Sequence, residues 1–261
     1  MGIKRSRTVS PTVLERNEEL LRLIRDIKAD HPFWGYRRIW AYLRYKLSLK
    51  VNQKRIYRLL KTNNLLVKPN LRLLAKRKVN TSKPKPTKLN EWWGIDMTKI
   101  MIDSFGWVYV VLVMDWHTKK IVGHYAGIQC KAKHWLEALD EALNKQFPNG
   151  VKEQKYKLNL MSDNGSQPTA VSFIKACSDL GVNQAFTSYN NPKGNADTER
   201  MMRTLKEELV WINEWKSPQE FFNKLGCWIK YYNNEYLHSS LKYKTPAQFE
   251  NEERKILLAA A

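Results

Sequence analysis

Cysteine is scarce in this chain of 261 residues, and long apolar runs are missing from it. The three cysteines lie far apart at positions 130, 177 and 227 with no CxxC pair, so neither a disulfide framework nor a zinc cluster is indicated. No apolar run of about eighteen residues exists, and residues 1–10 are basic without a hydrophobic segment. We therefore expect a protein of a reducing cytoplasm, with no membrane partner.

Acidic residues are also scarce in the first third of the chain. Residues 1–90 hold 24 lysines and arginines against 5 acids, whereas residues 91–261 hold 21 against 20. The net charge of +20 is therefore almost entirely N-terminal. A charged block of this sign predicts a phosphate-backbone ligand. A solvated surface or a contact with anionic lipid is the alternative interpretation.

Three helices are predicted within residues 1–68. The second, over residues 36–47, places Ile39, Leu43 and Leu47 on one stripe, and the third begins after Asn52, a good N-cap. Two short helices with a tight connection resemble a helix-turn-helix, whose second helix enters the major groove of DNA. A small basic bundle without groove contacts is the alternative. The residues expected to contact DNA are Arg37, Arg38, Lys54, Arg55 and Arg58.

The remainder of the chain alternates between linker, strand and helix patterns. Residues 68–88 are rich in Lys, Pro, Asn, Ser and Thr and indicate a basic linker. After it, an antiparallel meander is followed by alternating helices and strands, which predicts an α/β sheet with helices on its faces. The expected strands are 92–102, 107–116, 121–128, 157–162 and 182–187, and the expected helices are 132–147, 169–180, one from about 195, and a helical tail over 217–250.

Three acids stand at special places in this pattern. Asp96 lies in the middle of a strand, where an acid is poorly suited to packing, whereas Asp163 alone is typical of a turn and Glu199 alone of a helix start. Asp163 and Glu199 are separated by 35 residues. Separated carboxylates without His or Cys suit Mg²⁺ or Mn²⁺, and two such ions can support phosphoryl substitution.

Other candidates for this acidic site are less suitable. Asp197 is two residues from Glu199, so on a helix it points about 200° away. Asp115 is expected to be structural or an outer partner of the site, and Glu207 and Glu208 to be charges on a helix surface. His238 is expected to be structural or to contact DNA. The ten tryptophans are interpreted mainly as core, although they could stack on bases.

The order of motifs identifies a family resemblance over nearly the whole chain. The segments are HPFWGYRRIWAYL with VNQKRIYRLLKTNNLL, WGIDMTKI, WVYVVLVMDWHTKKIVGH, LMSDNGSQ, NPKGNADTERMMRTLKEEL and YYNNEYLHSSLKYKTPAQF. Together they resemble the integrase-core (DDE) transposases of bacterial insertion sequences, in the copy-out, paste-in group related to retroviral integrases.

This resemblance implies a fold, a site and a reaction. The fold would be an RNase H-like α/β core, a mixed five-stranded sheet flanked by helices, with Asp96, Asp163 and Glu199 as catalytic ligands of two Mg²⁺ or Mn²⁺ ions. The reaction would be cleavage at element ends and transfer of the 3′ hydroxyl to target DNA. The implied domains are a helix-turn-helix domain (1–68), a basic linker (69–90), the catalytic core (91–210) and a helical extension (211–261).

The resemblance also implies DNA contacts and partners. Lys193, Arg203 and Lys206 are expected to bind DNA, and Lys206 lies seven residues, or about 700° of α-helix, beyond Glu199 and so on the same face. The expected partners are double-stranded DNA with terminal inverted repeats, target DNA, further copies of the chain, and the protein of an upstream reading frame, in a bacterial cytoplasm beside the nucleoid. A catalytically silent DNA-binding relative and an RNase H-like nuclease are the alternatives.

Overall fold

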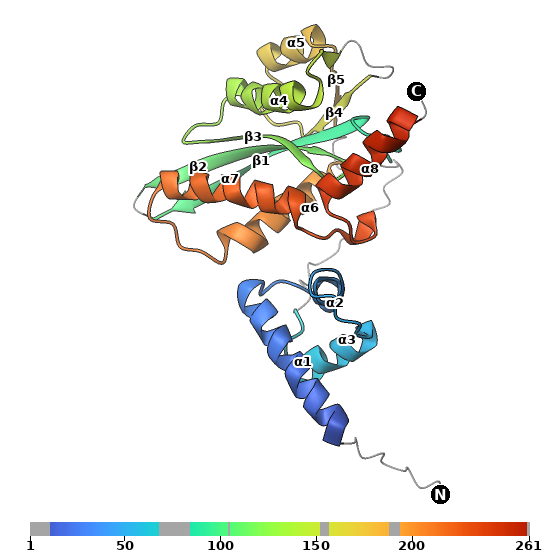
Figure 1. Ribbon diagram of the computed structural model, residues 1–261. Helices are drawn as coiled ribbons and strands as arrows, with labels where there is room; N and C mark the ends of the chain where they lie inside the picture. Colours follow the sequence, from blue (N-terminus) through green and yellow to red (C-terminus); the bar gives the residue numbers. More distant parts are fainter. Residues whose placement is uncertain (1–10, 68–83, 104, 152–156, 188–193, 260–261) are drawn as a thin grey trace, which may run out of the picture. The chain divides into compact units, whose positions relative to one another are not determined.

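The computed structural model describes residues 11–67, 84–103, 105–151, 157–187 and 194–259. The chain divides into two compact units, residues 1–75 and 76–261 (Figure 1). In the first unit the helices are α1 (Pro11–Asp30), α2 (Tyr36–Tyr45) and α3 (Gln53–Thr62). None of the helices in the described ranges is long and apolar enough to cross a membrane.

The N-terminal unit is a three-helix bundle around a small apolar core. The side chain of Asn52 caps α3 by accepting a hydrogen bond from the Lys54 N–H at 2.8 Å, as its sequence position predicts. The stripe predicted on α2 is shorter than expected, because α2 ends at Tyr45 and Leu47 beyond it is exposed. The core residues are Leu20, Ile24, Ile27, Trp34, Ile39, Leu43, Ile56 and Leu60.

The second unit is built on a mixed five-stranded sheet in the order β3-β2-β1-β4-β5. The first three strands pair antiparallel, and β4 and β5 add parallel to β1. The predicted fold class, an α/β core with a helical C-terminal region, is thus confirmed. The strands are β1 (Trp92–Ile102), β2 (Gly106–Asp115), β3 (Ile121–Gly127), β4 (Asn159–Ser162) and β5 (Asn183–Phe186). The helices are α4 (Ala132–Gln146), α5 (Val171–Asp179), α6 (Ala196–Leu205), α7 (Pro218–Asn234) and α8 (Pro246–Ala259).

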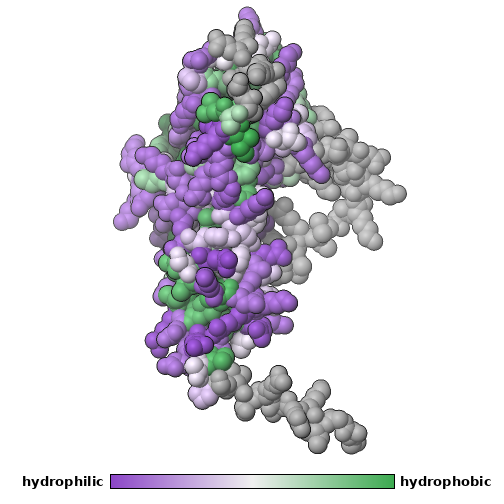
Figure 2. Space-filling model, turned by 45° about the vertical axis from the view of Figure 1, so that its right-hand side comes forward, coloured by the Kyte–Doolittle hydropathy of each residue, from purple (hydrophilic) through white to green (hydrophobic). Residues whose placement is uncertain are grey.

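Each face of the sheet buries a separate apolar layer. Side chains alternate along β1, so Trp93 and Ile95 pack under α4 and α5, whereas Ile100 and Ile102 pack against α6 and α7. Figure 1 shows these two pairs of helices on opposite sides of the sheet. Asp96 has the same parity as Ile100 and therefore lies on the α6 side. Hydrophilic residues cover most of the surface visible in Figure 2, which fits a fold whose large apolar groups lie in these layers.

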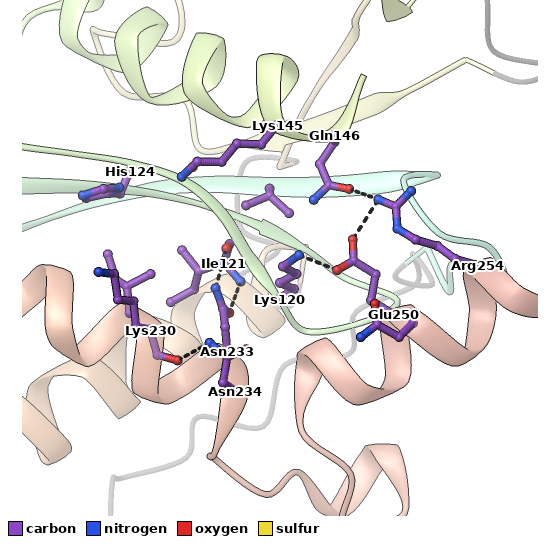
Figure 3. Close-up of a pocket in the computed structure, with 14 residues that line it drawn as sticks. Lys120, Ile121, His124, Lys145, Gln146, Lys230, Asn233, Asn234, Glu250 and Arg254 are labelled. Atoms are coloured by element: carbon purple, nitrogen blue, oxygen red, sulfur yellow. Dashed lines mark hydrogen bonds and ion pairs between the residues drawn. The ribbon is translucent and has the colours of Figure 1, made fainter. Parts of the chain in front are cut away.

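The free edge of β3 is covered by side chains from the flanking helices. Asn233 of α7 accepts a hydrogen bond from the Ile121 N–H and donates one to the Ile121 carbonyl, both at 2.9 Å (Figure 3). Nearby, buried Glu250 of α8 lies between Lys120 and Arg254. Burial alone would raise the pKa of Glu250, but hydrogen bonds and charges from these two cations lower it. These contacts hold α7 and α8 against the sheet. They also cover part of an edge strand, whose unpaired backbone groups could otherwise pair with another chain.

The position of α6 is set by a close approach to β1 at Gly94. A Cβ on Gly94 would lie 1.9 Å from Thr198 Oγ1 and 2.3 Å from Trp116 Nε1. These two atoms are hydrogen-bonded to each other at 2.9 Å, with the indole donating. Only glycine therefore lets α6 lie directly on β1, two residues before Asp96.

We predict that Gly94→Ala destabilises the fold. Overpacking of this kind costs about 1 to 3 kcal/mol, because Thr198 and Trp116 must both move to admit the methyl group. The matched control is Gly226→Ala within α7, where a Cβ meets no atom within 4 Å and alanine should stabilise by up to about 1 kcal/mol. Denaturant unfolding of both variants measures the difference, and equal stabilities would contradict this account of the α6 contact.

Candidate active site

Asp96 lies within β1, and Asp163 directly follows β4, the parallel neighbour of β1. The register of β1 with β4 pairs Gly94 with Met161. Continuing it by two residues brings Asp163, just after β4, opposite Asp96. The Asp163 carboxylate accepts the Gly165 N–H at 3.1 Å, so the turn that its sequence predicts is present. Asp163 can therefore form this turn and also lie beside Asp96.

Glu199 reaches the same region from α6. It is exposed in the first turn of the helix, where a carboxylate is favoured by the helix dipole. Neighbouring Asp197 instead forms an ion pair with Lys119, with 3.0 Å between Oδ2 and Nζ. The pairing of Asp197 with Lys119 agrees with the prediction that Asp197 and Glu199 do not share one site.

The electrostatics of Asp96 connect these three acids. The pKa of Asp96 is raised to about 7, mainly because burial disfavours its charged form, and the charges of Asp163 and Glu199 add to the rise. The Met97 N–H, which donates to Asp96 at 2.8 Å, and the Lys206 ammonium lower it. Asp163, Glu199 and Lys206 are therefore close enough to influence the charge of Asp96.

The chemistry of these donors suits a hard divalent cation. All three are carboxylates, and their mutual repulsion is the kind that such a cation relieves. As the side chains stand, no group of three His, Cys, Asp or Glu residues in the described parts of the chain is arranged to hold a metal ion. Asp163 and Glu199 are exposed, so ligation would require these side chains to turn toward Asp96.

Lys206 begins a helical segment that the sequence did not predict. After α6 the chain continues as a π-helix over Lys206–Val210 rather than as a regular α-helix. The seven residues from Glu199 to Lys206 are therefore almost all α-helical, and the predicted shared direction agrees with the effect of Lys206 on Asp96. Glu207 and Glu208 were predicted to be surface charges, and this prediction is wrong, because both are buried at 9% and 8% exposure.

Asp115 has a structural place apart from the three acids. It is fully buried and accepts three backbone N–H groups, from Asn90 at 2.9 Å, His117 at 2.7 Å and Thr118 at 3.3 Å. Burial raises its pKa to about 6, and these hydrogen bonds limit the rise. Asp115 thus fixes the turn after β2. His238 packs among aromatic rings of the C-terminal region, 5.0 Å from the ring of Tyr236.

The residues predicted to contact DNA differ in how they are held. Arg37, Lys54 and Arg58 are exposed. Arg55 is half-buried, and its Nε donates to Asn17 Oδ1 at 2.8 Å, which joins α3 to α1. Arg203 is paired with Glu207, with 2.7 Å between Nε and Oε1. The remaining predicted positions are Arg38, which is half-buried, and Lys193, which lies outside the described residues.

Sequence reasoning missed a pair of residues toward the end of the β1–β2 hairpin. Trp107 was grouped with the core tryptophans but is 43% exposed, and the Nζ of Lys99 lies 4.5 Å from the centre of its ring. Both lie toward the turn of the β1–β2 hairpin. The available signal was the position of Trp107 directly after the Gly106 turn, at the start of a strand.

The comparisons with known proteins agree with this arrangement. An HTH-like domain model matches residues 15–72, and two integrase core domain models match residues 86–192 and 180–246. The chain is similar to the transposase InsD for insertion element IS2A/D/F/H/I/K of Escherichia coli, at 23% identity over 88% of this chain and 78% of the relative. A similar InsD from insertion element IS2D of Escherichia coli (strain K12) has the same identity and coverage.

One solved structure shows the same fold at low identity. It is a chain in the cryoEM structure of a simian T-cell lymphotropic virus intasome in complex with the PP2A regulatory subunit B56 gamma. The match has a TM-score of 0.52 and 15% identity, and covers 80% of this chain and 73% of the other.

We predict a pH dependence of stability that arises from Asp96. Its pKa is about 7 in the folded protein against 3.8 as the reference value, so the folded state binds the extra proton and loses stability as pH rises through this range. Without divalent cations, Asp96→Asn should match the wild type near pH 4 and be increasingly more stable than it toward pH 7 and above. Unfolding free energies across this range measure the effect. Asp140→Asn, which changes an exposed acid of α4, is the control, and parallel curves for Asp96→Asn and wild type would refute the assignment.

Proposed function

Because the chain belongs to the integrase core family and carries an HTH-like domain before that core, we propose that it is a transposase. It cuts DNA strands at the ends of an insertion sequence and transfers the freed 3′ hydroxyl to a target strand. The observation that carries this proposal is the position of Asp96 on β1, which pairs with β4 just before Asp163 and packs closely against α6, the helix that bears Glu199. The similarity to InsD transposases supports the same reaction.

In this proposal the three acids hold two divalent cations, Mg²⁺ or Mn²⁺. When bound, such ions activate the attacking oxygen and stabilise the leaving oxygen in an in-line substitution at phosphorus. Asp96 supplies its carboxylate from the rigid centre of β1, and Glu199 supplies another from α6, which Gly94 holds against that strand. Asp163 completes the set from the turn after β4. Integrase-core proteins are metal-dependent, which agrees with this use of carboxylates.

Lys206 binds a phosphate of the DNA end beside these acids. Its ammonium is near enough to lower the pKa of Asp96, and a flexible lysine stem can deliver positive charge to a phosphodiester. The cation cannot ligate a metal ion. Its role is therefore to orient the scissile phosphate and to offset the negative charge that collects there.

The two units divide the work of recognition and chemistry. We assign residues 1–68 to DNA binding, 69–90 to a basic linker, 91–210 to catalysis and 211–261 to a helical extension of the core. Exposed basic residues on α2 and α3 match a duplex backbone and groove. A reaction that joins two element ends to one target uses at least two active sites, so the working form is an oligomer on double-stranded DNA. An upstream-frame protein is a further candidate partner.

We predict that Asp96→Asn, Asp163→Asn and Glu199→Gln each abolish cleavage and joining. Each change removes a ligand charge but little volume, so folding and DNA binding should persist. Labelled element ends with Mg²⁺ or Mn²⁺ report cleavage and strand transfer, and a gel-shift experiment without metal reports binding. Asp197→Asn is the matched control on α6, and it should retain activity. Wild-type rates for any of the three variants would exclude that residue from the site.

We predict a separation between DNA contacts and structural contacts on α3. Lys54→Ala and Arg58→Ala should each weaken duplex binding and reduce the salt dependence by about one counterion, without lowering the thermal midpoint. Arg55→Ala should instead lower the stability of the N-terminal unit by about 1 kcal/mol or more, because it breaks the bond to Asn17. Lys133→Ala, at an exposed position of α4, is the control. If all three α3 variants behaved alike, the division between the two kinds of contact would be wrong.

A further inference from the structure

A cavity of about 420 Å³ is lined by residues from the hairpin end of β1 and β2 and from the chain that follows α6. Figure 1 shows that this part of the chain leads from α6 to α7. Lys206 lines this cavity and also acts on the charge of Asp96. Lys206 directly follows α6, which carries Glu199, so the cavity lies along the same helical segment as one of the three acids. The other residues that carry the argument are Lys99, Asp103, Trp107, Trp211 and Glu214.

The edge of β1 is open along this approach. Within the described residues, β4 pairs with β1 only from Trp92 to Gly94. Beyond Asp96, that edge of β1 has no neighbouring strand in these parts of the chain. A DNA strand whose phosphate lies at Asp96 and Lys206 can thus continue along β1 into the cavity without displacing a strand.

Three tryptophans line this cavity, and two of them, Trp107 and Trp211, are exposed. Trp211 is 57% exposed and Trp107 is 43% exposed, whereas most other tryptophans of the core are buried. Trp211 follows directly after the π-helix, and this segment contributes Lys206 and Val210 to the same lining. Exposed indole rings in a concave site suit the stacking of a planar base, which contributes about 1 to 3 kcal/mol for each base.

The charges of the cavity favour a base over a phosphate. The formal charges of Lys99 and Lys206 are cancelled by those of Asp103 and Glu214. A phosphate deep in the cavity would face these two carboxylates. The amino groups of a base can instead donate hydrogen bonds to such carboxylates.

We propose that this cavity binds one unpaired base of the DNA end, next to the phosphodiester that lies at Asp96. Stacking on Trp211, with Trp107 nearby, holds the base, and Lys206 holds the adjoining phosphate. This inference rests on the proposed function, because it names the part of the DNA that the same site receives. It makes Trp211 a positioning residue for an opened or overhanging end rather than for a continuous duplex.

The experiment compares two DNA ends with full-length protein and no divalent metal, so that binding is measured without cleavage. One probe is a blunt duplex, and the other is the same duplex with a few unpaired nucleotides, each carrying 2-aminopurine at the terminal position. The wild type should bind the unpaired end more tightly and quench its fluorescence. Trp211→Ala should reduce that preference about fivefold or more and remove the quenching, whereas Trp211→Phe should retain most of both.

The controls separate stacking from folding and from the reaction itself. Ile256→Ala removes a similarly exposed apolar side chain from α8 and should leave both probes unchanged. Equal binding of the two ends by the wild type, or unchanged discrimination in Trp211→Ala, would overturn the inference. So would a finding that Trp211→Ala abolishes self-association while discrimination persists, since the cavity would then serve a protein partner. Metal-dependent cleavage by the wild type tests the proposed function separately. Cleavage without a preference for the unpaired end would overturn only the base-binding inference, and base binding without cleavage would count only against the proposed function.

Discussion

The contact between α6 and β1 is the constraint on which the site depends. Because Gly94 has no side chain, α6 can approach β1 closely. The space that a Cβ would need is occupied by Thr198 and Trp116, which are hydrogen-bonded to each other. Glu199 and Lys206 are carried by the same helical segment, so the contact fixes both relative to Asp96. The turn that carries Asp163 is placed separately, by the pairing of β4 with β1.

Two buried acids of the core, Asp96 and Asp115, differ in the groups that surround their carboxylates, and this difference separates a structural acid from a candidate catalytic one. Burial raises the pKa of both Asp96 and Asp115. Three backbone N–H groups surround Asp115, which therefore serves the turn that it caps. Asp96 receives one such bond, and the charges of Asp163 and Glu199 add to the effect of burial in raising its pKa. The repulsion at Asp96 disfavours its charge in the bare protein, and it is the repulsion that a bound cation would relieve.

The C-terminal helices complete the layer on which this site rests. Phe221, Leu225 and Trp228 of α7 belong to the same apolar cluster as Met201 and Leu205 of α6. The ion pairs of Glu250 and the bonds of Asn233 then hold α8 and α7 at the edge of the sheet. The helical extension is therefore part of the support of α6, since removing it would uncover the apolar side of that helix.

Local pattern in the sequence determined the elements of this protein. Alternation predicted the strands, helical spacing and the Asn52 cap predicted α3, and the mid-strand position of Asp96 marked the site. Asp163 and Glu199, which alone are typical of a turn and a helix start, stood out only through their joint arrangement with Asp96, and the family resemblance implied the same three residues.

Only the tertiary structure decided which side chains meet across long separations. Arg55 binds Asn17 within the N-terminal unit, and Glu207 and Glu208 are buried although they were predicted to be charges on a helix surface. The π-helix after Leu205 and the exposed Trp107 and Trp211 also depend on how α6 packs against the sheet. The spacing of apolar residues predicts which face of a single helix or strand is apolar. Burial and pairing depend on which other element covers that face, and the three-dimensional packing of the whole unit determines this.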